Sequence, residues 1–61
     1  MDEKIEGYRN GAAFMRANVE RYGVREGTAL MRDAQRFSRY TADFAAGMCD
    51  ALIQGAQERS I

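Results

Sequence analysis

Five arginines in the middle of the chain are candidates to bind another molecule: Arg21, Arg25, Arg32, Arg36 and Arg39. A guanidinium group donates hydrogen bonds in a planar fork that matches the geometry of carboxylate and phosphate groups. These arginines could contact the phosphates of RNA or DNA, or they could form an ordinary solvated helix surface. If the chain bends at residues 23–27, most of them gather, together with Arg16, at one basic end of the molecule.

Phe14 is a second candidate contact residue. At helical spacing it lies opposite Ile5, on a side of the helix whose other members are Gly7, Gly11, Asn18 and Arg21. A phenylalanine on a polar, glycine-opened side is a candidate anchor for a partner protein, because aromatic residues are over-represented among interface hot spots. Two alternatives stay open: Phe14 contacts a second copy of the chain, or it is a single exposed apolar residue without a role.

Few residues of this chain could support catalysis or hold a cofactor. There is no histidine, so the most common acid–base group is missing. The single cysteine, Cys49, has no basic neighbour one turn away, which favours a buried thiol over a reactive one. One thiol with scattered carboxylates does not form a zinc site, and no glycine cluster matches a phosphate-binding loop. We therefore expect no enzymatic activity, no cofactor, no metal ion and no small-molecule substrate.

The length of 61 residues allows one domain at most. A chain this short removes only about 60% of its unfolded surface from water, so an isolated copy would be marginally stable. With a single cysteine, no disulfide can form within the chain. The expected support is therefore a second subunit or a partner protein.

Charge and hydropathy restrict where such a chain can act. Nine basic and nine acidic residues cancel, so no overall field draws the molecule to a membrane or to nucleic acid. No apolar run approaches the roughly 18 residues needed to span a bilayer. The start of the chain, Met-Asp-Glu-Lys, is not the basic start of a signal peptide. We expect a cytoplasmic protein that does not contact membranes.

Two stretches of apolar residues at helical spacing predict an all-α fold. The first stretch alternates steps of three and four, as in a coiled-coil seam, through Ile5, Tyr8, Ala12, Met15, Val19 and Tyr22. The second follows the same spacing through Leu30, Ala34, Phe37, Thr41, Phe44, Met48 and Leu52. The sequence predicts a single helical domain over residues 1–61, an antiparallel hairpin with a helix over about 3–22, a turn at 23–27 and a longer helix over about 28–58.

Glycine and threonine mark the predicted bend. Gly23 suits the left-handed residue that ends many helices, and Thr28 suits the N-cap of the next one. The second helix would be about 45 Å long against about 30 Å for the first. We expect it to be continuous, because the apolar stripe keeps its phase through Gly47; the alternative is a break near Gly47 and three helices.

The second helix is apolar over a wider arc than one neighbouring helix can cover. Two hairpins are therefore expected to pair as a homodimeric four-helix bundle. Gly47, Ala51 and Gly55 recur every four positions and permit close approach of helices, although surface alanines are also ordinary helix formers. The residues expected at the dimer interface are Met31, Ala45, Met48, Cys49, Leu52, Ile53 and Ala56.

Size and composition leave two main hypotheses for function. The first is a small protein–protein interaction module, such as an inhibitor or adaptor that occludes a larger macromolecular machine and is encoded by a phage or mobile element. That hypothesis rests on size and fold class. The alternative is a dimeric RNA- or DNA-binding regulator that uses the arginine-rich end, and a purely structural subunit is a third possibility.

Overall fold

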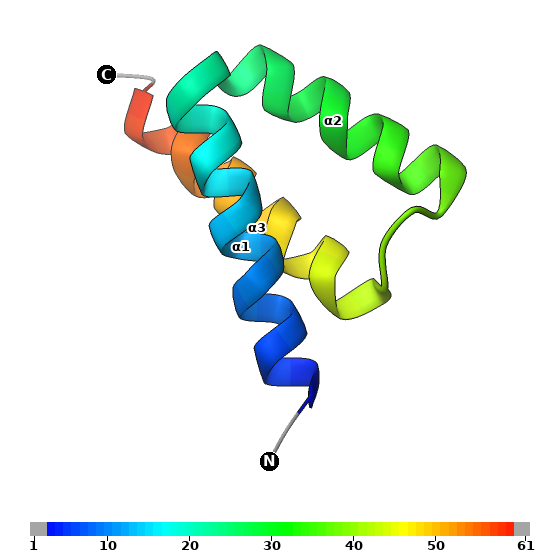
Figure 1. The fold of residues 1–61 in the computed structure, drawn as a ribbon. Coiled ribbons are helices and arrows are strands. Elements are labelled where there is room, and N and C mark those ends of the chain that lie inside the picture. Colours follow the sequence, from blue (N-terminus) through cyan, green and yellow to red (C-terminus); the bar gives the residue numbers. More distant parts are fainter. Residues whose placement is uncertain (1–2, 60–61) are drawn as a thin grey trace.

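The computed structural model describes residues 3–59 and confirms the all-α class. Helix α1 spans Glu3–Tyr22, α2 spans Val24–Phe37 and α3 spans Ala42–Arg59 (Figure 1). The prediction of a two-helix hairpin is wrong, because the long second helix is divided into α2 and α3. None of the helices within the described residues is both long enough and apolar enough to cross a membrane. Residues 1–2 and 60–61 of the predicted domain lie outside the described range.

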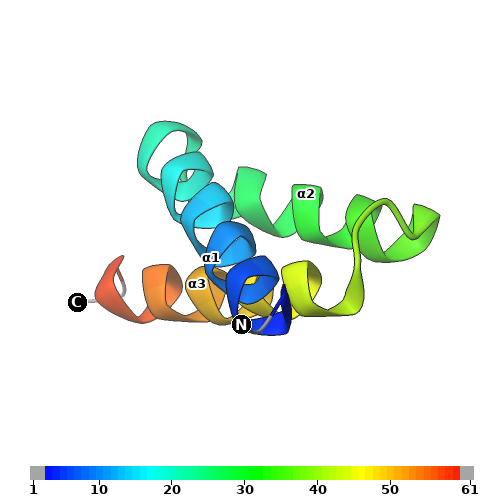
Figure 2. The same ribbon diagram turned by 60° about the horizontal axis from the view of Figure 1, so that its bottom comes forward.

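The first and third helices run in similar directions and cross, while α2 runs back in the opposite direction to α3 (Figures 1 and 2). The register along the crossing helices confirms their direction: Gly7 lies beside Asp43, and Val19 lies beside Gly55. Most of the packing joins α1 to α3, and α2 contacts both of them less extensively. The segments that pack most closely are therefore the two that lie farthest apart in the sequence.

A single residue, Gly23, connects α1 to α2. Its φ is +96°, a conformation that side-chain-bearing residues rarely adopt, and its N–H donates a 2.8 Å hydrogen bond to the Val19 carbonyl at the end of α1. Its own carbonyl accepts a 3.1 Å bond from the N–H of Gly27, which closes the first turn of α2. The predicted turn over 23–27 is therefore wrong, because only its first residue lies outside the helices.

The second glycine of the predicted turn, Gly27, lies inside α2 and is buried. A Cβ at this position would come 2.9 Å from the Val19 side chain and 3.0 Å from that of Leu52. The predicted N-cap, Thr28, also lies within α2, where its hydroxyl donates a 2.8 Å hydrogen bond to the Val24 carbonyl one turn earlier. The glycine at position 27 is therefore explained by the close packing of Val19 and Leu52 around it, and it does not mark a turn.

The predicted continuous helix over 28–58 breaks at residues 38–41, and not near Gly47. Ser38 takes the left-handed conformation with φ +51°, and the N–H of Arg39 donates a 3.1 Å hydrogen bond back to the Ala34 carbonyl. Thr41 then caps α3, because its hydroxyl oxygen accepts a 3.3 Å hydrogen bond from the N–H of Phe44. Asp43 adds a negative charge in the first turn, which the helix dipole favours.

Gly11 and Gly47 form the point of closest approach between α1 and α3. A Cβ on Gly11 would lie 2.7 Å from the carbonyl carbon of Phe44, and one on Gly47 would lie 2.8 Å from the amide nitrogen of Ala12. Both distances are far shorter than a carbon side chain tolerates against rigid backbone. The small residues of the third helix therefore serve close packing within one chain, against α1.

The core consists of six apolar residues drawn from all three helices: Met15, Val19, Met31, Ala34, Met48 and Ala51. No polar or charged residue of the described range is buried. Two predicted dimer-interface residues belong to this core, since Met48 has no exposed surface and Met31 is 6% exposed. Neither can contact a second copy in this conformation, so both are removed from the interface candidates.

Candidate functional site

The predicted arginines do not gather at one end of the molecule. Arg21 lies in the last turn of α1 and Arg25 at the start of α2, whereas Arg36 lies in the last turn of α2 and Arg39 just beyond its end. Arg25 and Arg36 are separated by about 16 Å along the helix axis. The expected basic pole is therefore wrong: α2 begins at once after Gly23 and carries the later arginines away from the junction.

Three of these arginines nevertheless share one side of α2. Arg25, Arg32 and Arg36 fall within about 40° of each other around the helix, since they are seven and four residues apart. All three are exposed, and the buried residues Gly27, Met31 and Ala34 occupy the opposite side of the helix.

Phe14 packs within its own chain against the rings of Tyr40 and Phe44, two contacts that the sequence analysis did not predict. The Phe14 ring centre lies 5.9 Å from that of Tyr40 and 5.8 Å from that of Phe44, and Tyr40 stacks on Phe44 at 4.8 Å. These spacings lie in the range of favourable aromatic pairs. Phe14 still keeps 41% of its surface exposed, so the cluster has an open side.

A second exposed ring, Phe37, lies close in the chain to this cluster. Phe37 ends α2 and is 56% exposed. The guanidinium carbon of Arg36 is 5.3 Å from the ring centre, and that of Arg39 is 5.5 Å from it. Both distances are within the range of a cation–π interaction. The sequence had placed Phe37 in the buried stripe, because a continuous helix would have carried that stripe through residue 41.

We call Phe14, Arg36, Phe37, Arg39, Tyr40 and Phe44 the aromatic–arginine cluster. It combines apolar ring surface with ten guanidinium N–H donors and contains no carboxylate. Tyr40, Phe44 and Phe37 are the residues that sequence analysis missed. The pair Thr41 and Asp43 could have indicated these residues, because a threonine followed by an acidic residue is typical of the start of a helix. A helix that starts at this point brings Tyr40 and Phe44 together.

The remaining dimer-interface candidates lie along the side of α3 that faces away from Gly47. Ile53 is 52% exposed, while Ala45, Cys49, Leu52 and Ala56 are half-buried. Ala45, Cys49 and Leu52 pack against the edge of the core. The part of this side that is free to meet another molecule therefore centres on Ile53.

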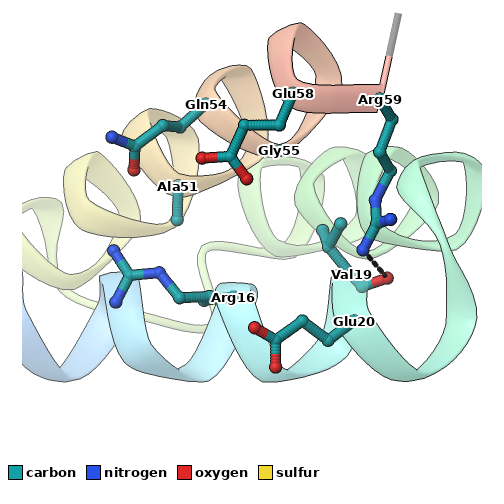
Figure 3. Close-up of a pocket in the computed structure, with 8 residues that line it drawn as sticks. All are labelled: Arg16, Val19, Glu20, Ala51, Gln54, Gly55, Glu58 and Arg59. Atoms are coloured by element: carbon teal, nitrogen blue, oxygen red, sulfur yellow. Dashed lines mark hydrogen bonds between the residues drawn. The ribbon is translucent and has the colours of Figure 1, made fainter. Parts of the chain in front are cut away.

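A shallow hollow of about 120 Å³ lies where α1 and α3 diverge beyond the glycine contact (Figure 3). Arg16 and Glu20 extend from α1, Gln54 and Glu58 extend from α3, and Val19, Ala51 and Gly55 form its apolar part. The Arg59 guanidinium donates a 3.4 Å hydrogen bond to the Val19 carbonyl oxygen. Charges of both signs line this hollow, so it does not select for one kind of ligand.

A hydrogen bond joins α1 to α3 near the opposite end of the crossing. The Tyr8 hydroxyl donates it to the Asp50 carboxylate. This bond, followed by partial burial and the negative charge of Asp50, raises the pKa of the Tyr8 phenol above its usual value of about 10.

Among residues 3–59 no group of three side chains is arranged to hold a metal ion.

Comparison with known proteins finds no matching family model, no similar curated protein and no similar solved structure.

Proposed function

We propose that this chain is a small non-enzymatic protein–protein interaction module that acts in the cytoplasm as an inhibitor or adaptor and covers part of a larger macromolecular machine. One observation carries the proposal: partly exposed rings and two arginines occur together in residues 36–44, and Phe14 of α1 packs against two of those rings. Tyrosine, phenylalanine and arginine are enriched at protein interfaces, where aromatic anchors supply much of the binding energy. Phe14 is the anchor in this proposal.

The geometry of the cluster supports an anchor at Phe14 over a freely moving exposed ring. Contacts with the stacked Tyr40 and Phe44 hold one side of the Phe14 ring, while 41% of the Phe14 surface stays exposed. A ring that is already held loses less conformational freedom on binding, so more of its contact energy is retained as affinity.

The same proposal includes a homodimer, with α3 as the contacting helix. Ile53 is exposed, and its neighbours three and four residues away on α3 are the half-buried Cys49 and Ala56 and the exposed Asp50 and Gln57. Cys49 and Ala56 are small and uncharged, as are the exposed Ala42 and Ala46 on the same side, and small side chains allow two helices to approach closely. Sedimentation of the wild-type protein and of Ile53→Asp measures this: a dimer that becomes monomeric supports the arrangement.

The alternative function, binding of RNA or DNA, is favoured by the exposed row of Arg25, Arg32 and Arg36 on α2. Guanidinium groups on one side of a helix suit the regularly spaced phosphates of a nucleic acid. Affinity that depends on phosphate contacts falls steeply as salt concentration rises. A nucleic-acid partner lost on combined Arg25→Gln, Arg32→Gln and Arg36→Gln substitution would favour this function over the first.

Affinity capture with matched variants tests the anchor. The tagged protein is incubated with lysate of its source organism, with and without nuclease, and Phe14→Ala is compared with Tyr22→Ala. Tyr22 is also an exposed aromatic residue of α1 but lies outside the cluster. We expect Phe14→Ala to lose a nuclease-resistant protein partner that Tyr22→Ala retains, with the helical circular dichroism of both variants unchanged. Equal capture by the two variants would refute the anchor role.

A further inference from the structure

We propose that Arg36 and Arg39 recognise a pair of carboxylates, so that the partner of the aromatic–arginine cluster is an acidic protein surface. This inference rests on the proposed function, because it names the chemistry of the partner that would meet the cluster. It starts from an arrangement that the proposed function does not use: two guanidinium groups placed around one exposed ring, Phe37.

The backbone holds the two arginines in place. The bond from the Arg39 N–H to the Ala34 carbonyl closes the end of α2, and the left-handed Ser38 directs the chain out of the helix. Arg36 is still helical, so both side chains leave from ordered backbone on either side of Phe37. Their guanidinium carbons are at most about 11 Å apart, which is the sum of their distances to the ring centre.

The guanidinium groups remain available to a ligand. Both arginines are exposed, and within residues 3–59 each interacts with the Phe37 ring and forms no salt bridge. Contact with the ring orients each fork while leaving its N–H donors unoccupied. A carboxylate that meets such a fork forms charge-assisted hydrogen bonds, which are about twice as strong as neutral ones.

The spacing suits two carboxylates on one element of a partner. Acidic residues three or four positions apart on a helix have Cβ atoms about 5–6 Å apart, and flexible side chains extend that reach. Such a pair can meet both guanidinium groups at once, while a neighbouring apolar side chain contacts the exposed Phe37 ring. Charge complementarity on the partner therefore adds to apolar contact with this part of the cluster.

Two features favour a protein over a nucleic acid at this place. Asp33 lies one turn before Phe37 and Asp43 lies between Tyr40 and Phe44 in the chain, so a phosphate backbone that continued past the arginines would meet like charge. The guanidinium groups also occupy space around the Phe37 ring that a stacked base would need. A short acidic segment of a protein avoids both conflicts.

Designed probe peptides test the inference without the native partner. The probe is a fluorescent helical peptide with two glutamates four positions apart beside a leucine, and its control carries glutamine at both positions. Binding is measured by fluorescence anisotropy at low salt and at physiological salt. The Arg36→Gln/Arg39→Gln variant is compared with Arg25→Gln/Arg32→Gln, which removes the same charge from the same helix outside the cluster.

We expect the glutamate peptide to bind the wild-type protein more tightly than the glutamine peptide does. The Arg36→Gln/Arg39→Gln variant should lose about tenfold or more in affinity, while the Arg25→Gln/Arg32→Gln variant changes by less than about threefold. An equal loss in both variants, or equal binding of the two peptides, would overturn the inference. A single-stranded RNA oligonucleotide that binds more tightly than the glutamate peptide would overturn it as well.

The two proposals fail in different ways. If the anchor role is wrong, Phe14→Ala keeps the native partner while the glutamate peptide still depends on Arg36 and Arg39. If the carboxylate inference is wrong, the affinity of the glutamate peptide does not change on Arg36→Gln/Arg39→Gln substitution, while Phe14→Ala still loses the native partner.

Discussion

The crossing of α1 with α3 and the connection between α2 and α3 are built from opposite kinds of side chain. At the crossing, Gly11 and Gly47 place backbone against backbone with no room for a methyl group. At the connection, Phe37 is large, as is Phe14, which packs from α1 against Tyr40, yet 56% and 41% of their surfaces stay exposed. Two buried glycines therefore form the tightest contact of the interior, while two phenylalanines keep much of their surface exposed.

The residues that stabilise the fold therefore differ from the residues that we propose to bind a partner. Close backbone approach brings the flanking residues of both helices into contact, so Met15 and Met48 can be fully buried even though the crossing point has no side chains. Tyr40 and Phe44 pack against the core, but Phe37 and Phe14 bury too little surface to be explained as core. Large apolar side chains left exposed beside arginines are typical of a surface that binds a partner.

The largest expected effect concerns the crossing. Gly47→Ala should destabilise the protein by about 3 kcal/mol or more, because the new Cβ meets rigid backbone of α1 and the helices must separate. Intrinsic helix propensity alone would favour alanine by about 1 kcal/mol. Urea unfolding followed by circular dichroism measures the change in the free energy of unfolding.

Gly7→Ala is the matched control for that prediction. A Cβ on Gly7 would lie at an ordinary 3.5 Å from the Asp43 Cβ, so this variant should be as stable as the wild type or up to about 1 kcal/mol more stable. A Gly47→Ala protein that unfolds at the same urea concentration as Gly7→Ala would contradict the close contact.

An intermediate effect is expected at the connection. Thr41→Ala removes the hydroxyl that accepts the N–H of Phe44 and should cost about 1 kcal/mol in the free energy of unfolding. Thr28→Ala removes a hydroxyl within α2 that bonds to the Val24 carbonyl, and should change stability by less than about 0.5 kcal/mol. Thermal unfolding of both variants compares the two threonines, and equal losses would mean that Thr41 does not act as a cap.

The smallest expected effect is a pH dependence at Tyr8. Its phenol has a raised pKa in the folded protein, so the folded state holds this proton more tightly than the unfolded state does. The resulting stabilisation is complete below the unfolded pKa of about 10 and is lost as the pH rises through the folded value. Unfolding of wild type and Tyr8→Phe at pH 8 and above pH 10 measures it: the wild type should lose its advantage at high pH, and a constant difference would exclude this linkage.

Sequence periodicity was informative wherever a helix keeps one face toward the same neighbours. It predicted a first helix over 3–22, and α1 spans Glu3–Tyr22. Met15, Val19, Ala34 and Met48 were members of the predicted apolar stripes and belong to the core. It failed between Phe37 and Thr41, where the apolar spacing continues by chance through a break made by Ser38 and the Thr41 cap.

The candidate site was predicted less well than the fold. Phe14, Arg36 and Arg39 were named from the sequence, but as members of separate surfaces. The ring contacts that they make depend on the break at residues 38–41, which places Tyr40 and Phe44 against Phe14 and leaves Phe37 beside the arginines. A continuous helix would have kept Phe37 and Phe44 in one row along a single stripe.

The sequence by itself determined that the chain is helical, that α1 ends at a glycine with positive φ, and that Met15, Val19, Ala34 and Met48 lie on the inner sides of their helices. These properties depend on neighbours within a few residues, so local spacing and local hydrogen bonding are sufficient to decide them. Only the tertiary structure decided which small residues are contact points and which aromatic residues meet. Glycine looks the same in a sequence whether it frees a turn, as Gly23 does, or admits a neighbouring backbone, as Gly47 does, because the difference lies in atoms far away along the chain.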